Sequence, residues 1–181
     1  LAEKAGARAI CEPDLSALAW RGKIYAVTGT NGKTTLTSFL ERALNTAGIK
    51  AISAGNIGKP LSAFCAEMDD TSTTAAVCEL SSFQTSRLEF LRPDALFWTN
   101  FAPDHLDWHT DMREYFSAKF NLVKNLKTKF LFAGSDVFEA AKEYGFKIPD
   151  FAKIPSQIDA RECPKPFDTS VQSLNYSMAY E

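Results

Sequence analysis

Short apolar runs alternate along most of the chain with longer segments of helical periodicity. The apolar runs, which we expect to be strands, cover residues 24–28, 49–53, 75–80, 95–99 and 130–133. The segments expected to be helices cover residues 33–47, 60–68, 82–91, 111–126 and 137–144. Strands that alternate with helices in this way build a mostly parallel sheet with helices on both faces. We therefore predict an α/β fold.

Both ends of the sequence depart from this alternation. Residues 1–12 have the character of a helix end followed by a short strand, and we assign residues 1–20 to a preceding unit and a linker. Residues 146–181 contain four prolines, and we expect short antiparallel strands there. Residues 21–181 would then form one domain that is truncated at its C-terminal end.

Composition excludes several classes of function. The 20 basic and 22 acidic residues give a net charge of −2, which argues against a general nucleic-acid or membrane-surface binder. The longest stretch without a charged residue, residues 169–180, is 12 residues long, whereas a spanning helix needs about 20. The 4 cysteines lie far apart without a CxxC pair, which favours a reducing, cytosolic compartment.

Residues 28–35 read T-G-T-N-G-K-T-T, directly after an expected strand and at the start of an expected helix. Small residues let backbone N–H groups surround phosphate oxygens, and the helix N-terminus adds partial positive charge. Lys33 would then bind the β- and γ-phosphates, and the Thr34 hydroxyl is suited to Mg²⁺. Position 27, where the first glycine of GxxxxGK[ST] would lie, is Val27, so the alternative is an ordinary strand–helix turn.

Polar groups also follow two other expected strands. Glu79 lies at the end of one strand, where a carboxylate faces the crevice in which parallel sheets bind ligands. Residues 104–109 (D-H-L-D-W-H) place both histidines and two carboxylates after the next strand, a pattern that suggests a metal or phosphate site. The alternatives are a surface carboxylate and a solvated loop. Ser81 could bind a polar substrate or cap the next helix.

The fourth expected helix carries a charged residue on its apolar face. Met112, Tyr115, Leu122 and Leu126 form a stripe at helical spacing, and Lys119 occupies the position missing from it. A lysine at such a position either extends its ammonium group to water or takes part in chemistry.

Together these motifs resemble the central domain of the Mur ligases, most closely the branch that adds D-glutamate. The resemblance covers residues 23–125 and rests on short segments: GTNGKTT at 29–35, GNIG at 55–58, ELSSFQ at 79–84, NFAPDHLDWH at 100–109, and the pair Ala118-Lys119. ELSSFQ is the segment most typical of that branch.

The resemblance implies a P-loop NTPase-like domain that uses ATP and Mg²⁺. The implied ATP-binding residues are Gly29, Thr30, Asn31, Gly32, Lys33, Thr34, Thr35 and Asn175. Asn175 is the only asparagine that this chain keeps from a family segment, H-N-x-x-N, that contacts adenine. The implied Mg²⁺ ligands are Thr34, Glu79, His105 and Lys119, the last as a carbamate. Asn56 and Ser81 match positions near the nucleotide-sugar substrate, and Lys33, His105 and Lys119 match catalytic positions.

The resemblance also implies a reaction: ATP-dependent addition of D-glutamate to UDP-N-acetylmuramoyl-L-alanine, through an acyl phosphate, in peptidoglycan synthesis. Family members have an N-terminal UDP-binding domain, of which residues 1–20 would be a remnant, and a C-terminal amino-acid-binding domain, which we expect this chain to lack. We therefore expect a monomeric, cytoplasmic protein that is inactive as this chain alone and binds neither nucleic acid nor membrane. The alternatives are another Mur-type or folylpolyglutamate-type ligase, or a nucleotide-binding module without catalysis.

Overall fold

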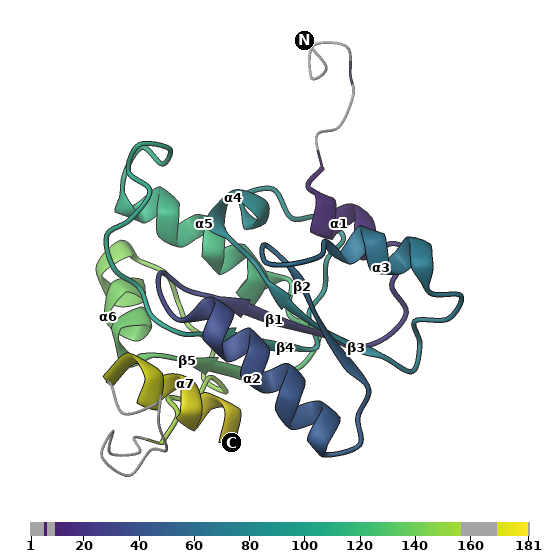
Figure 1. The fold of residues 1–181 in the computed structure, drawn as a ribbon. Coiled ribbons are helices and arrows are strands. Elements are labelled where there is room, and N and C mark those ends of the chain that lie inside the picture. The colour runs from purple at the N-terminus through teal and green to yellow at the C-terminus, as the bar shows by residue number, and fades with distance from the viewer. Residues whose placement is uncertain (1–5, 7–9, 157–169, 181) are drawn as a thin grey trace.

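The computed structural model describes residue 6, residues 10–156 and residues 170–180. At its centre lies a five-stranded parallel sheet with the strand order β2-β3-β1-β4-β5 (Figure 1). The strands are β1 (Ile24–Thr28), β2 (Ala51–Gly55), β3 (Ala75–Glu79), β4 (Ala95–Trp98) and β5 (Leu131–Ala133). The predicted α/β class is therefore confirmed.

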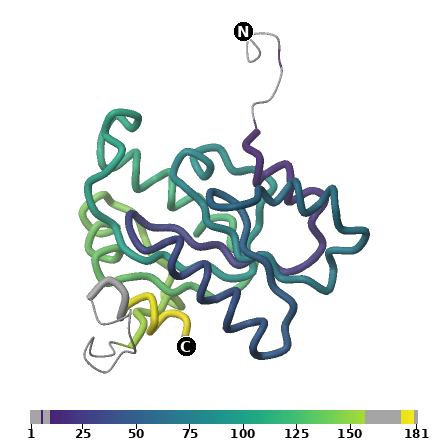
Figure 2. The backbone as a smooth tube through the Cα atoms, in the orientation of Figure 1, coloured from purple at the N-terminus to yellow at the C-terminus, as the bar shows by residue number. Residues whose placement is uncertain are grey.

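Helices cover both faces of this sheet. The described helices are α1 (Glu12–Ser16), α2 (Lys33–Thr46), α3 (Leu61–Glu67), α4 (Ser82–Thr85), α5 (Met112–Lys124), α6 (Ser135–Tyr144) and α7 (Ser170–Tyr180). Helices α2 and α7 lie side by side although they are far apart in the sequence (Figure 2). They pack on the face that carries Val27 and Phe97, whereas α3, α5 and α6 pack on the opposite face. Burial of apolar side chains on both faces is what holds these layers together.

Asp14 attaches α1 to the body of the domain. Its side chain is 0% exposed, and its carboxylate accepts the backbone N–H groups of Glu89, Phe90 and Leu91 at 2.9, 2.8 and 2.7 Å. These bonds also explain why the helix predicted over residues 82–91 is wrong beyond α4. The N–H groups of residues 89–91 bind a carboxylate from a distant part of the sequence instead of continuing the helical ladder.

Two other expectations need correction. The strand predicted at residues 49–53 begins only at Ala51, because the Ile49 N–H donates to the Leu44 carbonyl at the end of α2.

The antiparallel strands expected after residue 146 are wrong for the described residues. Lys153 bridges in parallel to Phe132 beside β5, and residues 170–180 form α7, which buries Met178 against the sheet. Residues 157–169, and residues 1–5 and 7–9 of the expected N-terminal helix end and strand, lie outside the described part. The predicted boundary at residue 20 stays a prediction.

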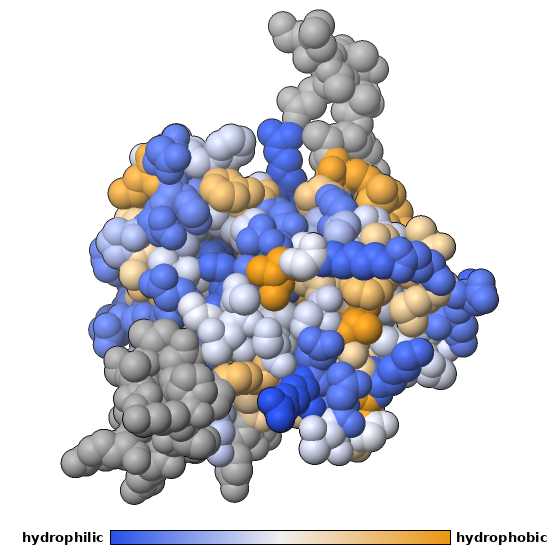
Figure 3. Space-filling model, in the orientation of Figure 1, coloured by the Kyte–Doolittle hydropathy of each residue, from blue (hydrophilic) through white to orange (hydrophobic). Residues whose placement is uncertain are grey.

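The surface is mixed in character. Most of the face shown in Figure 3 is hydrophilic, with hydrophobic residues near α1 and α3, where Leu15 and Leu18 are exposed. A hollow of about 580 Å³ lies beside Lys23 and Asp94, which precede β1 and β4. It is therefore at the end of the sheet opposite to the motif that is predicted to bind phosphate. None of the helices in the described residues is long and apolar enough to cross a membrane.

We predict that Asp14→Ala lowers the free energy of unfolding by about 3 kcal/mol, because three backbone N–H groups lose a charged acceptor. Urea unfolding measures this change. The control is Asp69→Ala, at an exposed position, which should stay within about 0.5 kcal/mol of the parent. Equal effects of the two substitutions would contradict this account of α1.

Candidate active site

Residues 29–32, which are predicted to bind phosphate and are called the phosphate loop below, join β1 to α2 at the carboxyl edge of the sheet. Gly29 and Gly32 have φ angles of +146° and +79°. A Cβ on Gly29 would lie 1.9 Å from the Thr99 hydroxyl oxygen, and one on Gly32 would lie 2.6 Å from the Asn175 amide nitrogen. Both the backbone conformation and the available space thus require glycine at these positions. Asn175, which is 0% exposed, is placed against the loop by α7.

Residues that follow β4 hold this loop in shape. The Asn31 N–H donates to Asn100 Oδ1 at 2.8 Å, and the Asn31 carbonyl accepts from Asn100 Nδ2 at 3.0 Å. The same carbonyl accepts from Thr99 Oγ1 at 2.6 Å. Sequence reasoning did not assign this role to Thr99 or Asn100, although Asn100 lies within a recognised motif. The side chains of Thr99 and Asn100 therefore fix the backbone of the loop at Asn31.

The Lys33 side chain folds over its own loop. Its Nζ donates to the carbonyl oxygens of Gly29 and Thr30 at 3.1 and 2.7 Å. Burial lowers the pKa of Lys33, while the negative charges of Glu79 and Asp104 act to raise it. Because Lys33 is only partly buried, a phosphate group can replace these carbonyl partners.

Glu79 connects two other predicted site residues, Thr34 and Asn56. Its position opposite Val27 in the β1–β3 register places it beside the phosphate loop. The side chain is 2% exposed, and its Oε2 and Oε1 accept hydrogen bonds from Thr34 Oγ1 at 2.7 Å and Asn56 Nδ2 at 3.2 Å. Carboxylate and hydroxyl oxygens are the ligands that Mg²⁺ prefers, so Thr34 and Glu79 fit this ion.

His105 begins the turn after β4 that was predicted to bind metal or phosphate. It has a φ of +53°, and its Nε2 lies 3.5 Å from Asp104 Oδ2. Its ring packs against Phe83 with centroids 4.9 Å apart. In the described part of the chain, no group of three or more His, Cys, Asp and Glu side chains is arranged to hold a metal. The structure therefore does not gather His105 and Glu79 into such a group.

The other two polar residues of this region have structural partners. Ser81 caps α4 in a capping box with Gln84, which is the capping alternative left open by the sequence. His109 is 2% exposed, and its Nε2 lies 3.0 Å from Ser82 Oγ. It therefore attaches the turn that carries His105 to α4.

Lys119 is buried at the phosphate loop. It is 1% exposed, and its Nζ donates to the Gly29 carbonyl at 2.8 Å, the same oxygen that Lys33 contacts. The structure thus excludes the alternative in which the ammonium group extends to water. Burial, and after it the positive charge of Lys33, lower the pKa of Lys119 to about 7. A substantial fraction of this amine is therefore neutral near pH 7.

Comparison with known proteins identifies the family. Residues 27–153 match the model of the Mur ligase middle domain. The chain belongs to the Mur ligase family. One relative is the UDP-N-acetylmuramoylalanine–D-glutamate ligase of Natranaerobius thermophilus, 43% identical over 59% of this chain and 23% of that protein. The corresponding ligase of Leuconostoc citreum is 39% identical over 82% of this chain and 31% of that protein. The chain thus spans less than a third of the length of these two Mur ligases.

Solved structures of Mur ligases share the fold. A UDP-N-acetylmuramoyl-L-alanyl-D-glutamate–2,6-diaminopimelate ligase superposes with a TM-score of 0.56 at 22% identity, covering 78% of this chain and 33% of that one. The MurF ligase of Thermotoga maritima in complex with ADP gives 0.54 at 18% identity, covering 79% and 34%. At these identities the likeness concerns the fold alone.

We predict that Lys119 makes stability depend on pH. The pKa of this lysine is lowered from 10.5 to about 7 on folding, so between these values the unfolded chain binds more protons and stability rises with pH. Lys119→Met should remove this contribution, and the parent's unfolding free energy relative to the variant should increase from about pH 7 to about pH 9. Urea unfolding in CO₂-free buffer measures the difference.

The control is Lys124→Met, at an exposed position of the same helix, which should keep the pH dependence of the parent. An unchanged pH dependence in Lys119→Met would mean that this amine does not titrate near neutrality.

Proposed function

We propose that this chain is the ATP-binding domain of a ligase that joins D-glutamate to UDP-N-acetylmuramoyl-L-alanine in peptidoglycan synthesis. The observation that carries the proposal is the hydrogen bond from Thr34 to the buried Glu79, beside a loop whose Gly29 carbonyl contacts both Lys33 and Lys119. Relatives named for this reaction are 39–43% identical to the chain. In the reaction, the γ-phosphoryl group of ATP passes to the L-alanyl carboxylate. The D-glutamate amine then attacks the acyl phosphate, so that phosphate leaves and an amide forms.

The main physical difficulty of this reaction is that an anionic carboxylate must approach an anionic triphosphate. Lys33 would leave the carbonyls of Gly29 and Thr30 and bind the β- and γ-phosphates, while the N-terminus of α2 faces the same oxygens. When bound, Mg²⁺ would supply further neutralisation of the phosphate charge. We propose that its ligands are Thr34, Glu79, His105 and Lys119.

The remaining assignments extend the site toward the substrates. Asn56, which already contacts Glu79, and Ser81 would face the nucleotide-sugar substrate. Asn175 lies beside Gly32 and would approach the adenosine part of ATP. These contacts would hold the reacting groups together, and positioning of this kind can supply roughly 7–11 kcal/mol of the reduction in the barrier.

Lys119 would act as a carbamate. Its neutral amine attacks CO₂, so that a nitrogen–carbon bond forms, an electron pair moves onto oxygen, and the amine releases a proton. The buried amine is thereby converted into an anionic oxygen ligand suited to Mg²⁺. An unmodified ammonium group at this position would instead repel the metal.

The specificity of the full-length gene product tests the proposed substrate. Incorporation of radiolabelled D-glutamate into UDP-N-acetylmuramoyl-L-alanine, with little incorporation of L-lysine, diaminopimelate or L-glutamate, would support it. Preference for another of these amino acids would assign the domain to a different Mur-type or folylpolyglutamate-type ligase. ATP binding with no amide formed from any of them would favour a nucleotide-binding module.

We predict that Lys33→Ala in the full-length gene product lowers kcat by at least about 10³-fold, because the phosphates lose their counter-ion at the transition state. The fold should be kept, since Lys33 is the first residue of α2 and is only partly buried. Steady-state phosphate release and thermal unfolding measure the two effects, and Lys142→Ala, on the exposed side of α6, is the control. Near-parental kcat and ATP affinity in Lys33→Ala would refute the assignment of this loop.

We predict that Lys119→Ala is similarly impaired and that added formate or acetate partly restores its activity, because a small carboxylate can occupy the place of the carbamate. The full-length gene product bound to Mg²⁺ and nucleotide should show the carbamate in a high-resolution crystal structure. An unmodified Lys119 in that structure would contradict the proposed carbamate, as would a Lys119→Ala variant with unimpaired activity.

A further inference from the structure

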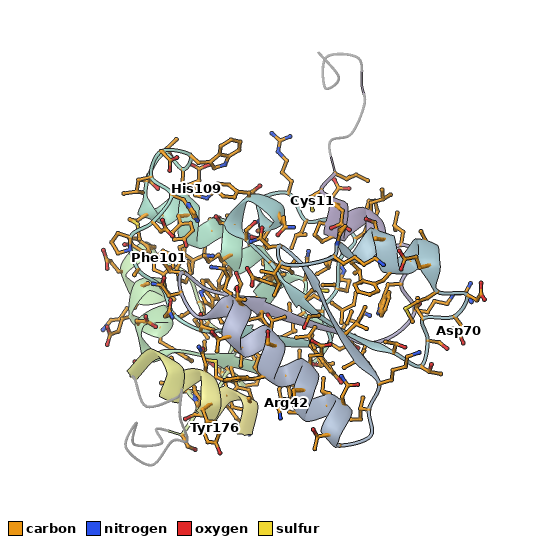
Figure 4. All side chains as sticks on the ribbon, in the orientation of Figure 1. Cys11, Arg42, Asp70, Phe101, His109 and Tyr176 are labelled. Carbon is orange, nitrogen blue, oxygen red and sulfur yellow. The ribbon has the colours of Figure 1, made fainter. Side chains whose placement is uncertain are left out.

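Tyr115 is a buried tyrosine on α5 that has no role in the reaction proposed above. Its side chain is 0% exposed, and it lies one helical turn before Lys119 on the same face. Its ring contacts those of Phe101, His105 and His109, with centroids 5.1, 6.0 and 5.2 Å away. Figure 4 shows Phe101 and His109 on the same side of the molecule, near α5. Tyr115 therefore supports the turn that carries His105.

The Tyr115 hydroxyl binds the phosphate loop. It lies 3.2 Å from Thr30 Oγ1, an oxygen that also contacts the Ala102 carbonyl at 3.2 Å and the Ala102 N–H at 3.0 Å. Because a carbonyl only accepts, Thr30 must donate its single proton to Ala102, and the Ala102 N–H fills one of its lone pairs. The other lone pair accepts from Tyr115.

The Tyr115 ring supports the Lys119 side chain. The Lys119 Nζ lies 4.8 Å from the ring centroid, so the end of this side chain packs against the ring. The same Nζ donates to the Gly29 carbonyl. Tyr115 is thus linked to two consecutive residues of the loop, to Thr30 directly and to Gly29 through Lys119.

We propose that Tyr115 is a positioning residue that fixes the phosphate loop relative to the face of α5 that carries Lys119. Its hydroxyl holds Thr30 and its ring supports the Lys119 side chain, so that the nucleotide phosphates and the end of the Lys119 side chain meet in one geometry. The inference rests on the proposed function, in which both the loop and Lys119 take part in phosphoryl transfer.

The Tyr115→Phe variant of the full-length gene product tests the hydroxyl, since it keeps the ring and removes one hydrogen bond. We expect kcat to fall about tenfold, the equivalent of one hydrogen bond, while KM for ATP changes less than about twofold because the loop N–H groups remain. Tyr144→Phe is the control, since Tyr144 packs on the same Phe101 ring but belongs to α6. Parental kcat in Tyr115→Phe, or an equal fall in both variants, would overturn the proposal.

A double-mutant cycle identifies the partner of the hydroxyl. Thr30→Val removes the acceptor, so adding Tyr115→Phe to it should lower kcat by less than about twofold more. Independent, multiplying losses would mean that the hydroxyl acts somewhere other than Thr30, and the proposal would fail.

Amide hydrogen exchange tests the positioning without any assumption about the reaction. In the nucleotide-free protein, Tyr115→Phe should speed exchange about tenfold at Thr30 and Asn31, whose N–H groups donate to Asn100, and leave the β1 amides unchanged. If the unsubstituted protein had no ligase activity, the proposed function would fail, but the exchange measurement would still test the role of Tyr115. Unchanged exchange in the loop would overturn the role of Tyr115 even if the ligase activity is established.

Discussion

The parallel register of β1 with its two neighbours is the constraint on which the site depends. Val27 pairs with Glu79 on one side, and Thr28 pairs with Trp98 on the other. Because parallel strands end at the same edge of a sheet, the segments that follow them meet there. The loop after β1, the carboxylate that ends β3 and the residues after β4 are brought together in this way. The Leu80 carbonyl accepts the Thr28 hydroxyl at 2.9 Å, which joins two of these strand ends directly.

Burial determines which hydrogen-bond partners the charged groups at this edge need and which protonation state they favour. Glu79 and Lys119 are 2% and 1% exposed, and each has defined hydrogen-bond partners, as buried polar groups require. For Lys119 the partner is a neutral carbonyl and a second lysine lies nearby, so its protonated form is disfavoured. The Tyr115 ring lies 4.8 Å from the Lys119 Nζ and packs with the rings of Phe101 and His109. The same packing that stabilises α5 therefore also determines the reactivity of the lysine on it.

Local sequence patterns predicted much of the fold, and the errors have a common physical origin. The ranges of β1 and α2 followed from apolar periodicity, because neighbouring residues decide these elements. The helix predicted over residues 82–91 failed because its N–H groups bind Asp14, and α7 was missed because its burial depends on α2. Such long-range partners leave no periodic signal in the segment that they change.

The candidate site divides in the same way. The sequence by itself determined which reactive groups are available. These are the glycines of the phosphate loop with Lys33, Glu79 at a strand end, and Lys119 on an apolar helix face. Only the tertiary structure decided which of these groups meet. It placed Lys119 on the Gly29 carbonyl, assigned His109 to Ser82 and Ser81 to a helix cap, and placed Tyr115 between α5 and the loop. Residue type and spacing define what a side chain can do, whereas burial and partners depend on packing between segments that lie far apart in the chain.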